Sequence, residues 1–244
     1  GVDTQWVIQD ANQFTTFAFV SLMEDGERDF YFNRGADGQL SSEDLAALQL
    51  NEYSIVHFGS ATGFLPGPLQ SAYTDLLAKA KANNAIISFD PNYRHLLFQN
   101  NTQSFINQSW PFLEQCHFFK LSDEEAMLIT GCDSVQHAAA ALRKRSDAIF
   151  AITLGKEGTL LSVGDHLEMI GSIPITPVDA TGAGDAFVGA VLFQLINYTP
   201  AQLNAISLEE WKKIIANANK AGARTCEYMG AMEAFKHLNN SIFN

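Results

Sequence analysis

The sequence predicts an α/β fold in which a mostly parallel sheet is covered by helices on both faces. After Gly38, short apolar runs alternate with longer helical patterns, which is typical of parallel strands joined by crossover helices. Ahead of this region, two β-prone runs predict a separate hairpin. The chain has 244 residues, of which 47% are hydrophobic, so it can bury a core of the size that such a fold needs.

The hairpin is predicted by the β-prone runs Phe14 to Met23 and Arg28 to Asn33. Asp25-Gly26 lies between them, and an Asp-Gly pair in this position is a strong hairpin signal. Two interpretations stay open. The hairpin is an ordinary part of the core, or it is a small sheet that projects from the main body as a lid or a subunit contact.

The remaining elements follow in order along the chain. Strands are predicted at Ser54–Phe58, Ala85–Phe89, His117–Leu121, Ala148–Thr153, Gly158–Val163 and His166–Ile170, the last two as a hairpin. Helices are predicted at Pro66–Lys81, Ser122–Ile129, Ser134–Arg145, Ala183–Ile196 and Leu208–Cys226, with a short helix that begins at Thr199-Pro200. Because ligands in such folds bind at the carboxyl ends of the strands, the turns that follow strands are expected to hold the functional site.

Charge and composition exclude several classes of function. The formal net charge of −12 at pH 7 argues against a nucleic-acid partner or an anionic membrane surface, because both attract basic proteins. No stretch is long and apolar enough for a membrane span, and the residues from Gly1 onward lack the features of a signal peptide. Cys116, Cys132 and Cys226 are dispersed, which argues against a disulfide framework or a zinc site and favours a reducing, cytoplasmic location.

The stretch from Val178 to Phe187 carries the strongest chemical signal. Gly182 and Gly184 allow backbone conformations in which N–H groups converge on one point, and that point lies at a predicted helix N-terminus. Such a place can hold a phosphate or the charge of a transferring phosphoryl group. Asp185 lies in the first turn, where it can accept a proton from a substrate hydroxyl. The alternative is a plain helix start, with Asp185 as a partner of the helix dipole.

This stretch, Asp179-Ala-Thr-Gly-Ala-Gly-Asp185, resembles the signature D-T-x-G-A-G-D of the ribokinase-like (PfkB) carbohydrate kinases. Other matches appear in that family's order. They are Arg28 to Asp37 (similar to a fructokinase-type lid), Asp90-Pro91-Asn92-Tyr93-Arg94 (D-P-N-x-R), Thr153 to Gly158 (the nucleotide loop T-x-G-x-x-G) and Ala216-Asn217-Ala218 (the adenine-side A-N-A). The matches extend over essentially the whole chain, so the resemblance implies a ribokinase-like three-layer α/β/α fold with a small β lid.

The resemblance implies ATP-dependent phosphorylation of a sugar hydroxyl, with ATP and Mg²⁺ as cofactors. Asp185 would be the catalytic base, and backbone amides at Gly182, Ala183 and Gly184 would form the anion hole. Asp185 would take the hydroxyl proton while the sugar oxygen attacks the γ-phosphate in line. The lid resemblance makes fructose the leading substrate, and ribose, 2-keto-3-deoxygluconate and nucleosides are the alternatives.

The same resemblance implies further binding residues. Nucleotide binding is expected at Thr153, Gly155, Gly158 and Asn217, and substrate or phosphate binding at Asp90, Asn92 and Arg94. Each group has a structural alternative. The glycines support a hairpin, Asn217 lies on a helix surface, and Arg94 forms a surface ion pair.

Glu125 would take the position of the acid in the family's N-x-x-E motif, which acts near Mg²⁺ and phosphate. The Asn of that motif is Ser122 in this chain, and Ser122-x-x-Glu125 is equally a capping box. Both interpretations of Glu125 stay open. Lys120 lies at a strand end that faces the same crevice, where it contacts the nucleotide or is simply solvated.

The resemblance divides the chain into residues 1–38, the lid and the start of the substrate side, and residues 39–244, the nucleotide-binding and catalytic core. Family members begin with a first strand, a sugar-binding Asp and a Gly-Gly/Asn segment, so the chain is expected to lack the N-terminal strands. A nucleotide-binding protein without kinase activity is therefore the alternative function. Phe30 and Phe32 of the lid are expected to bury against a second subunit, which would make a homodimer.

Overall fold

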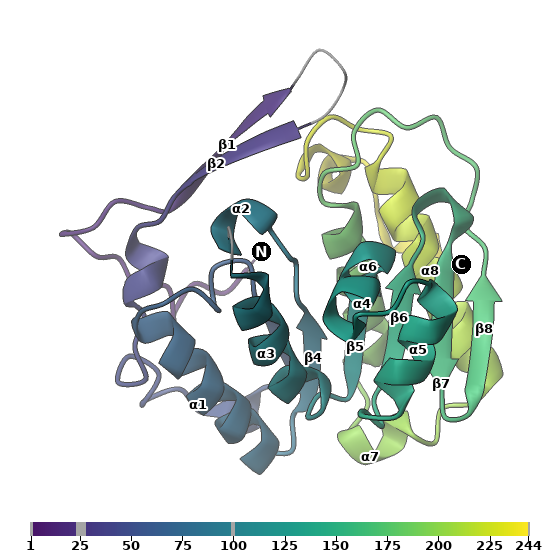
Figure 1. The fold of residues 1–244 in the computed structure, drawn as a ribbon, viewed down its shortest axis with the longest axis horizontal. Coiled ribbons are helices and arrows are strands. Elements are labelled where there is room, and N and C mark those ends of the chain that lie inside the picture. The colour runs from purple at the N-terminus through teal and green to yellow at the C-terminus, as the bar shows by residue number, and fades with distance from the viewer. Residues whose placement is uncertain (1, 23–27, 99–100, 244) are drawn as a thin grey trace.

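The computed structural model describes residues 2–22, 28–98 and 101–243, and a six-stranded sheet forms its centre (Figure 1). The strands lie in the order β3-β4-β5-β6-β7-β8. Their bounds are β3 (Ile55–Gly59), β4 (Ile86–Asp90), β5 (Phe118–Ser122), β6 (Ile149–Thr153), β7 (Thr159–Val163) and β8 (His166–Ile170). Strands β3 to β6 are parallel, and β7 and β8 continue the sheet as an antiparallel hairpin, so the predicted mostly parallel sheet is confirmed.

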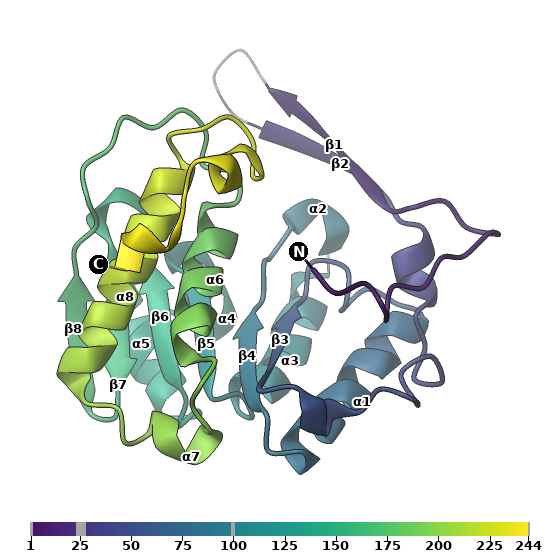
Figure 2. The ribbon, with the colours of Figure 1, turned by 180° about the vertical axis from the view of Figure 1, so that it is seen from behind.

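Helices cover both faces of this sheet and complete three layers (Figures 1 and 2). One face carries α1 (Pro68–Ala82), α3 (Thr102–Leu113), α4 (Asp123–Thr130) and α5 (Val135–Arg143), and the other carries α6 (Ala183–Leu195) and α8 (Leu208–Thr225). Two short helices are α2 (His95–Phe98) and α7 (Pro200–Leu203). Within the described residues, no helix combines the length and the apolar character that crossing a membrane requires.

Successive side chains of each strand enter opposite layers of the core. In β4, Ile87 and Phe89 pack on the side of α1 and α3, whereas Ile86 packs on the side of α6 and α8. All of β4 is buried, which explains why its sequence is apolar almost throughout. Ser88 and Asp90 in β4 and Lys120 in the middle of β5 are buried polar exceptions, and the alternation puts them on the α6 side.

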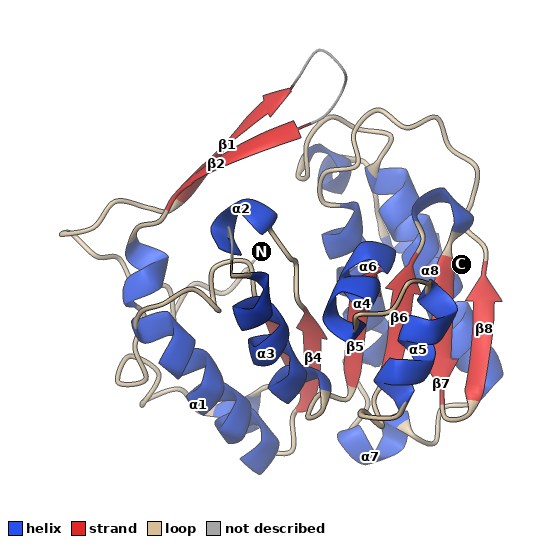
Figure 3. Cartoon of the chain, in the orientation of Figure 1, coloured by secondary structure: helices blue, strands red, loops and turns tan. Residues whose placement is uncertain are grey.

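The first two strands form a separate antiparallel sheet that extends away from the core (Figures 1 and 3). β1 (Phe17–Leu22) pairs with β2 (Arg28–Asn33), with Phe19 opposite Tyr31. These two rings are 61% and 69% exposed. The projecting sheet is therefore the correct interpretation of the hairpin. The predicted Asp25-Gly26 turn lies outside the described residues.

Polar contacts fix the base of this lid to the core. The hydroxyl of Thr16 donates to the carboxylate of Asp37. Arg34 donates from its guanidinium to the carbonyl of Pro66 at 2.7 Å and to the carbonyl of Thr62 at 3.2 Å. Because Thr62 and Pro66 lie in the segment before α1, these bonds attach the base of the lid to the layer that contains α1. The two strands extend beyond that layer.

The sequence does not predict α2 and α3. The α3 segment is rich in polar residues and contains Pro111, which has no backbone N–H and normally argues against a helix. In the structure, the side chain of Asn101 caps α3 by accepting from the N–H of Ser104, and Phe105 and Phe112 are buried against the sheet. Packing against the core therefore outweighs the unfavourable local composition.

Candidate active site

The glycine-rich turn before α6 is held by the buried carboxylate of Asp179. One carboxylate oxygen accepts from the N–H and the hydroxyl of Thr181, at 2.8 and 2.7 Å. The other accepts from the N–H of Gly230 at 2.8 Å, which ties the turn to the segment after α8. Gly182 follows with a φ of 80°, and a Cβ there would lie 2.8 Å from the Cβ of Ala231. Only glycine fits this position, and α6 begins directly after it.

In the first turn of α6, two backbone N–H groups find no hydrogen-bond acceptor in the described part of the chain. The N–H of Ala183 donates to Ala180 O at 3.2 Å, and that of Ala186 donates to Gly182 O at 2.9 Å. Among the described residues, the N–H groups of Gly184 and Asp185 have no protein acceptor. Of the anion-hole amides expected at Gly182, Ala183 and Gly184, only that of Ala183 has a protein acceptor among the described residues, and Asp185 adds a further free donor. The Asp185 side chain is exposed beside them.

A buried ion pair lies on the sheet side of this turn. Lys120 Nζ is 3.3 and 3.4 Å from the two carboxylate oxygens of Asp90, so Lys120 is not the solvated lysine of the alternative interpretation. A Cβ added to Gly184 would lie 3.2 Å from Lys120 Nζ, which shows how closely the ammonium approaches α6. Burial raises the pKa of Asp90 to about 6; Lys120 opposes this rise, whereas Glu125 and Asp185 add to it. The carboxylates of Asp90 and Asp185 therefore lie close enough for their charges to interact.

Glu125 is buried and uses both carboxylate oxygens inside the protein. One oxygen accepts from the N–H of Ser122 at 2.8 Å and completes the predicted capping box. The other accepts from the N–H of Tyr93 at 2.8 Å, in the loop that follows β4. The sequence predicts the first contact but not the second. Glu125 thus positions the loop that carries Asn92 and Arg94.

In that loop Asn92 has a φ of 52°, and its side-chain oxygen accepts from Arg94 at 3.2 Å. Arg94 also donates to the carbonyl of Tyr93 at 3.1 Å. Within the part of the chain that the structure describes, Arg94 forms no salt bridge, so the surface ion pair proposed as its alternative is not present there. Its guanidinium is half-buried, and local contacts hold it at the same edge of the sheet as Asp90.

A cavity of about 690 Å³ opens between α6, α8 and the β6–β7 turn. Thr153, Gly155 and Gly158, all predicted to bind nucleotide, line it. Other lining residues are Lys156, Ser172, Ile173, Pro174, Ile175, Pro177, Ala180, Ala183, Gly184, Phe187, Asn219, Gly222, Ala223 and Cys226. The cavity therefore runs from the β6–β7 turn to the first residues of α6, where the free amides lie.

Asn219, which the sequence does not single out, takes the place expected for Asn217. It lines the cavity, accepts from the buried hydroxyl of Thr159 at 2.6 Å and donates to the carbonyl of Ile170 at 2.9 Å. Asn217 is two positions away on the helix, so it faces another direction and donates to Gln194 of α6 at 2.9 Å. A signal was present, because Asn219, Gly222, Ala223 and Cys226 are spaced to share one face of α8.

The two glycines of the β6–β7 turn have different structural demands. Gly158 has a φ of 109°, and a Cβ there would lie 2.1 Å from the carbonyl oxygen of Ile170. It is required for the close approach of two backbone segments, as the structural alternative proposes. Gly155 has a φ of 56° with open space around it, so it shapes the cavity mouth without such a contact. A hairpin role and a place at the cavity coexist at Gly158.

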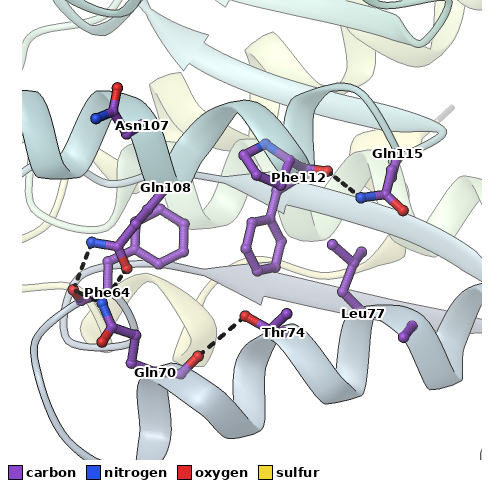
Figure 4. A pocket seen from close by; sticks show the side chains of 10 residues that line it. Phe64, Gln70, Thr74, Leu77, Asn107, Gln108, Phe112 and Gln115 are labelled. Atoms are coloured by element: carbon purple, nitrogen blue, oxygen red, sulfur yellow. Dashed lines mark hydrogen bonds between the residues drawn. The ribbon is translucent and has the colours of Figure 1, made fainter.

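A second cavity, of about 290 Å³, lies between α1 and α3 (Figure 4). Figure 4 shows the side chains of Gln70 and Gln108 turned toward each other and toward Phe64. Gln70 donates to Gln108 at 2.6 Å, and both amides donate to the carbonyl of Phe64. Its lining contains no ionisable side chain, so it offers no acid or base.

The described residues contain no group of three or more His, Cys, Asp or Glu side chains arranged to hold a metal ion. Both oxygens of Glu125 already accept backbone N–H groups, as described above. In the described part of the chain, the role that these contacts give Glu125 is to hold the loop after β4. The described side chains do not fit a metal ion held by the protein alone.

Comparison with known proteins supports one family. The family model described as "pfkB family carbohydrate kinase" matches residues 1–238. Fructokinase-1 of Zea mays is 32% identical over 238 residues, which cover 95% of this chain and 71% of the maize protein. The chain is therefore similar to this relative over nearly all of its length.

Solved structures agree with this comparison. The fructokinase of Vibrio cholerae O395 with fructose, ADP and calcium ion bound has a TM-score of 0.84 at 26% identity, and the match covers 99% of this chain and 76% of that one. Aminoimidazole riboside kinase of Salmonella enterica, complexed with aminoimidazole riboside and an ATP analogue, has a TM-score of 0.72 at 28% identity. That match covers 84% of this chain and 66% of the Salmonella chain.

Replacing Asn219 by Ala is expected to lower the free energy of unfolding by about 1–3 kcal/mol, because buried polar groups lose their partners. Those groups are the Thr159 hydroxyl and the Ile170 carbonyl. Asn217→Ala is the matched control on the same helix, and we expect it to change stability by less than about 1 kcal/mol. Urea unfolding followed by circular dichroism measures both variants. Equal losses would contradict the different environments assigned to the two residues.

Proposed function

The chain belongs to the pfkB family of carbohydrate kinases, and we propose that it transfers the γ-phosphoryl group of ATP to a hydroxyl of a small sugar. The observation that carries the proposal is the first turn of α6, where the free N–H groups of Gly184 and Asp185 lie beside the exposed Asp185 carboxylate. Phosphoryl transfer to an alcohol needs a base for the hydroxyl proton and donors for the charge on the phosphoryl group. This turn offers both.

In the proposed reaction the sugar hydroxyl lies between Asp185 and the γ-phosphate. The carboxylate accepts the hydroxyl proton while the sugar oxygen bonds to phosphorus, and the bond from phosphorus to the ADP oxygen breaks. The amides of Gly184 and Asp185 and the positive end of the α6 dipole stabilise the charge that spreads over the transferring group. Gly182 and Ala183 shape the turn that aims these amides.

We assign the nucleotide to the 690 Å³ cavity, because it connects the β6–β7 turn to this same turn of α6. The adenosine part would lie along Thr153, Gly155, Gly158 and Asn219, which places the phosphates toward Gly184. Asn217 is left out of this proposal, since its amide is directed at Gln194. Mg²⁺ bound to the phosphates would supply further neutralisation of their charge. The guanidinium of Arg94 is available to substrate or phosphate oxygens, with Asn92 holding it and Asp90 bound to Lys120.

Fructose is the proposed acceptor, supported by the fructokinases of maize and Vibrio cholerae among the relatives. A nucleoside is the second candidate, supported by the Salmonella aminoimidazole riboside kinase. A family member that binds nucleotide without transferring phosphate is the remaining alternative.

The lid supports a proposal about assembly. Phe17, Phe19 and Tyr31 are exposed on its strands by 40%, 61% and 69%, which is unusual for large apolar rings. We propose that this surface of the lid, which belongs to residues 1–38, packs against a second copy of the chain and forms a homodimer. Residues 39–244 form the core from which the lid extends. A cytoplasmic location is proposed as well, supported by three free cysteines. Recovery of the active protein in an oxidising, extracytoplasmic fraction would contradict it.

The dimer predicts a mass near twice that of one chain in sedimentation equilibrium. Replacing Phe19 by Asp should dissociate it, because the exchange puts a charge into the contact. The variant Phe235→Asp changes a ring that is 58% exposed on the core and should leave the mass unchanged. A monomeric wild-type protein at high concentration would refute the assembly.

Asp185→Asn is expected to lower kcat by about 10²–10⁴-fold while the affinity for ATP stays close to that of the wild type. The amide keeps the size of the side chain but cannot accept the hydroxyl proton. Coupled ADP release measures turnover, and calorimetry measures binding. Asp165→Asn, in the exposed turn between β7 and β8, is the control and should leave both unchanged. Near-normal turnover of Asp185→Asn would remove this residue from the mechanism.

A panel of acceptors tests the substrate class. ADP formation from ATP and Mg²⁺ is expected to be highest with fructose, compared with ribose, 2-keto-3-deoxygluconate and adenosine. If adenosine alone is phosphorylated, the acceptor is a nucleoside and not a sugar. Nucleotide binding without turnover of any acceptor would support the non-catalytic alternative.

A further inference from the structure

Lys120 is a buried cation that the mechanism above does not use. Its side chain is 7% exposed, and that of its partner Asp90 is 2% exposed. The contacts of 3.3 and 3.4 Å are longer than the roughly 2.7–2.9 Å of a charge-assisted N–H···O bond. An ammonium has three donors, and among the described residues only Asp90 accepts from this one. Donor capacity therefore remains at Lys120 Nζ.

The ammonium lies against the first turn of α6. A Cβ built on Gly184 would be 3.2 Å from Lys120 Nζ and 3.8 Å from Cε, so the missing side chain of Gly184 leaves room for the cation. The same turn carries the free amides of Gly184 and Asp185. A full positive charge, two N–H donors and the positive end of the helix dipole therefore converge on one place.

The surroundings of this cation are acidic. Asp90, Glu125 and Asp185 bring carboxylates to the same edge of the sheet, and the whole chain has a net charge of −12. Arg94, the other cation described at this edge, is bonded to Asn92 of its own loop. An incoming phosphoryl group would find its buried positive charge at Lys120.

We infer that Lys120 is a catalytic residue, whose ammonium donates a hydrogen bond to an oxygen of the γ-phosphoryl group during transfer. The inference rests on the proposed kinase function. Lys120 transfers no proton in this step, because the hydroxyl proton goes to Asp185. The bond from the sugar oxygen to phosphorus forms, and the bond from phosphorus to the ADP oxygen breaks. Asp90 is the positioning residue that holds the ammonium under Gly184.

The variant Lys120→Met keeps the length of the side chain and removes the charge. Its kcat is expected to fall about 10²–10³-fold, as for the loss of one preorganised donor in other active sites. Its affinity for a non-hydrolysable ATP analogue should fall about 10–100-fold, the equivalent of a lost hydrogen bond to a charged group. Its affinity for ADP should stay close to the wild-type value, because ADP lacks the phosphoryl group that Lys120 contacts.

Two glycine substitutions on α6 provide a matched pair. A Cβ at Gly184 would displace Lys120 Nζ, so Gly184→Ala should lose discrimination between the ATP analogue and ADP. Gly189 has open space around it, so Gly189→Ala should behave like the wild type. If Lys120→Met does not fold, the double variant with Asp90→Asn removes both buried charges and takes its place. Thermal unfolding checks that each variant is folded.

The outcomes separate the inference from the function on which it rests. If wild-type protein phosphorylates a sugar, and folded Lys120→Met keeps wild-type kcat and wild-type preference for the ATP analogue, the inference is wrong and the function stands. If the wild-type protein neither binds nucleotide nor phosphorylates any acceptor, both are wrong. Loss of kcat together with loss of that preference, at unchanged ADP affinity, supports the inference.

Discussion

The carboxylate of Asp179 is the contact on which the geometry of the site depends. It accepts from Thr181 on its own turn and from Gly230 beyond α8, so it joins two segments that are remote in sequence. With the turn fixed, Gly182 can hold its left-handed conformation and α6 starts at a defined point. The direction of the free amides is set before any substrate arrives, which is what electrostatic stabilisation of a transition state requires.

Parallel strands explain why chemically different groups gather at one edge. In the parallel register of β4 and β5, Phe89 lies opposite Phe119, so Asp90 and Lys120 come together although α2 and α3 separate them in sequence. The helix that follows β5 begins with its own capping box, and Glu125 reaches from there to the loop after β4. A single residue thus serves helix capping and loop positioning, which is why the two interpretations of its motif do not compete.

Sequence reasoning recovered β3 to β6 because buried parallel strands are continuous apolar runs, and it recovered α6 because Gly182 and Gly184 mark its start. It missed α3, where packing of Phe105 and Phe112 outweighs Pro111. It placed Asn217 rather than Asn219 at the cavity beside α6, because a short motif does not fix which face of a helix a residue occupies. The burial of Lys120 depends on contacts with β4 and α6, which no local pattern encodes.

The lid is a two-stranded sheet that is attached to the core near one end. Arg34 bonds its root to the core and the Thr16–Asp37 bond closes the root itself, whereas the two strands, as far as they are described, pair with each other and keep Phe19 and Tyr31 exposed. Apart from the contact of β2 with α2, the described part of the lid is held to the core at this root, so a change in the angle of the lid is expected to originate there. Exchanges at Phe19 or Tyr31 are therefore expected to leave the main sheet unaffected, whereas a change at Arg34 alters the attachment of the lid. Substitutions that change the contacts made by the lid and substitutions that change its orientation are therefore expected at different residues.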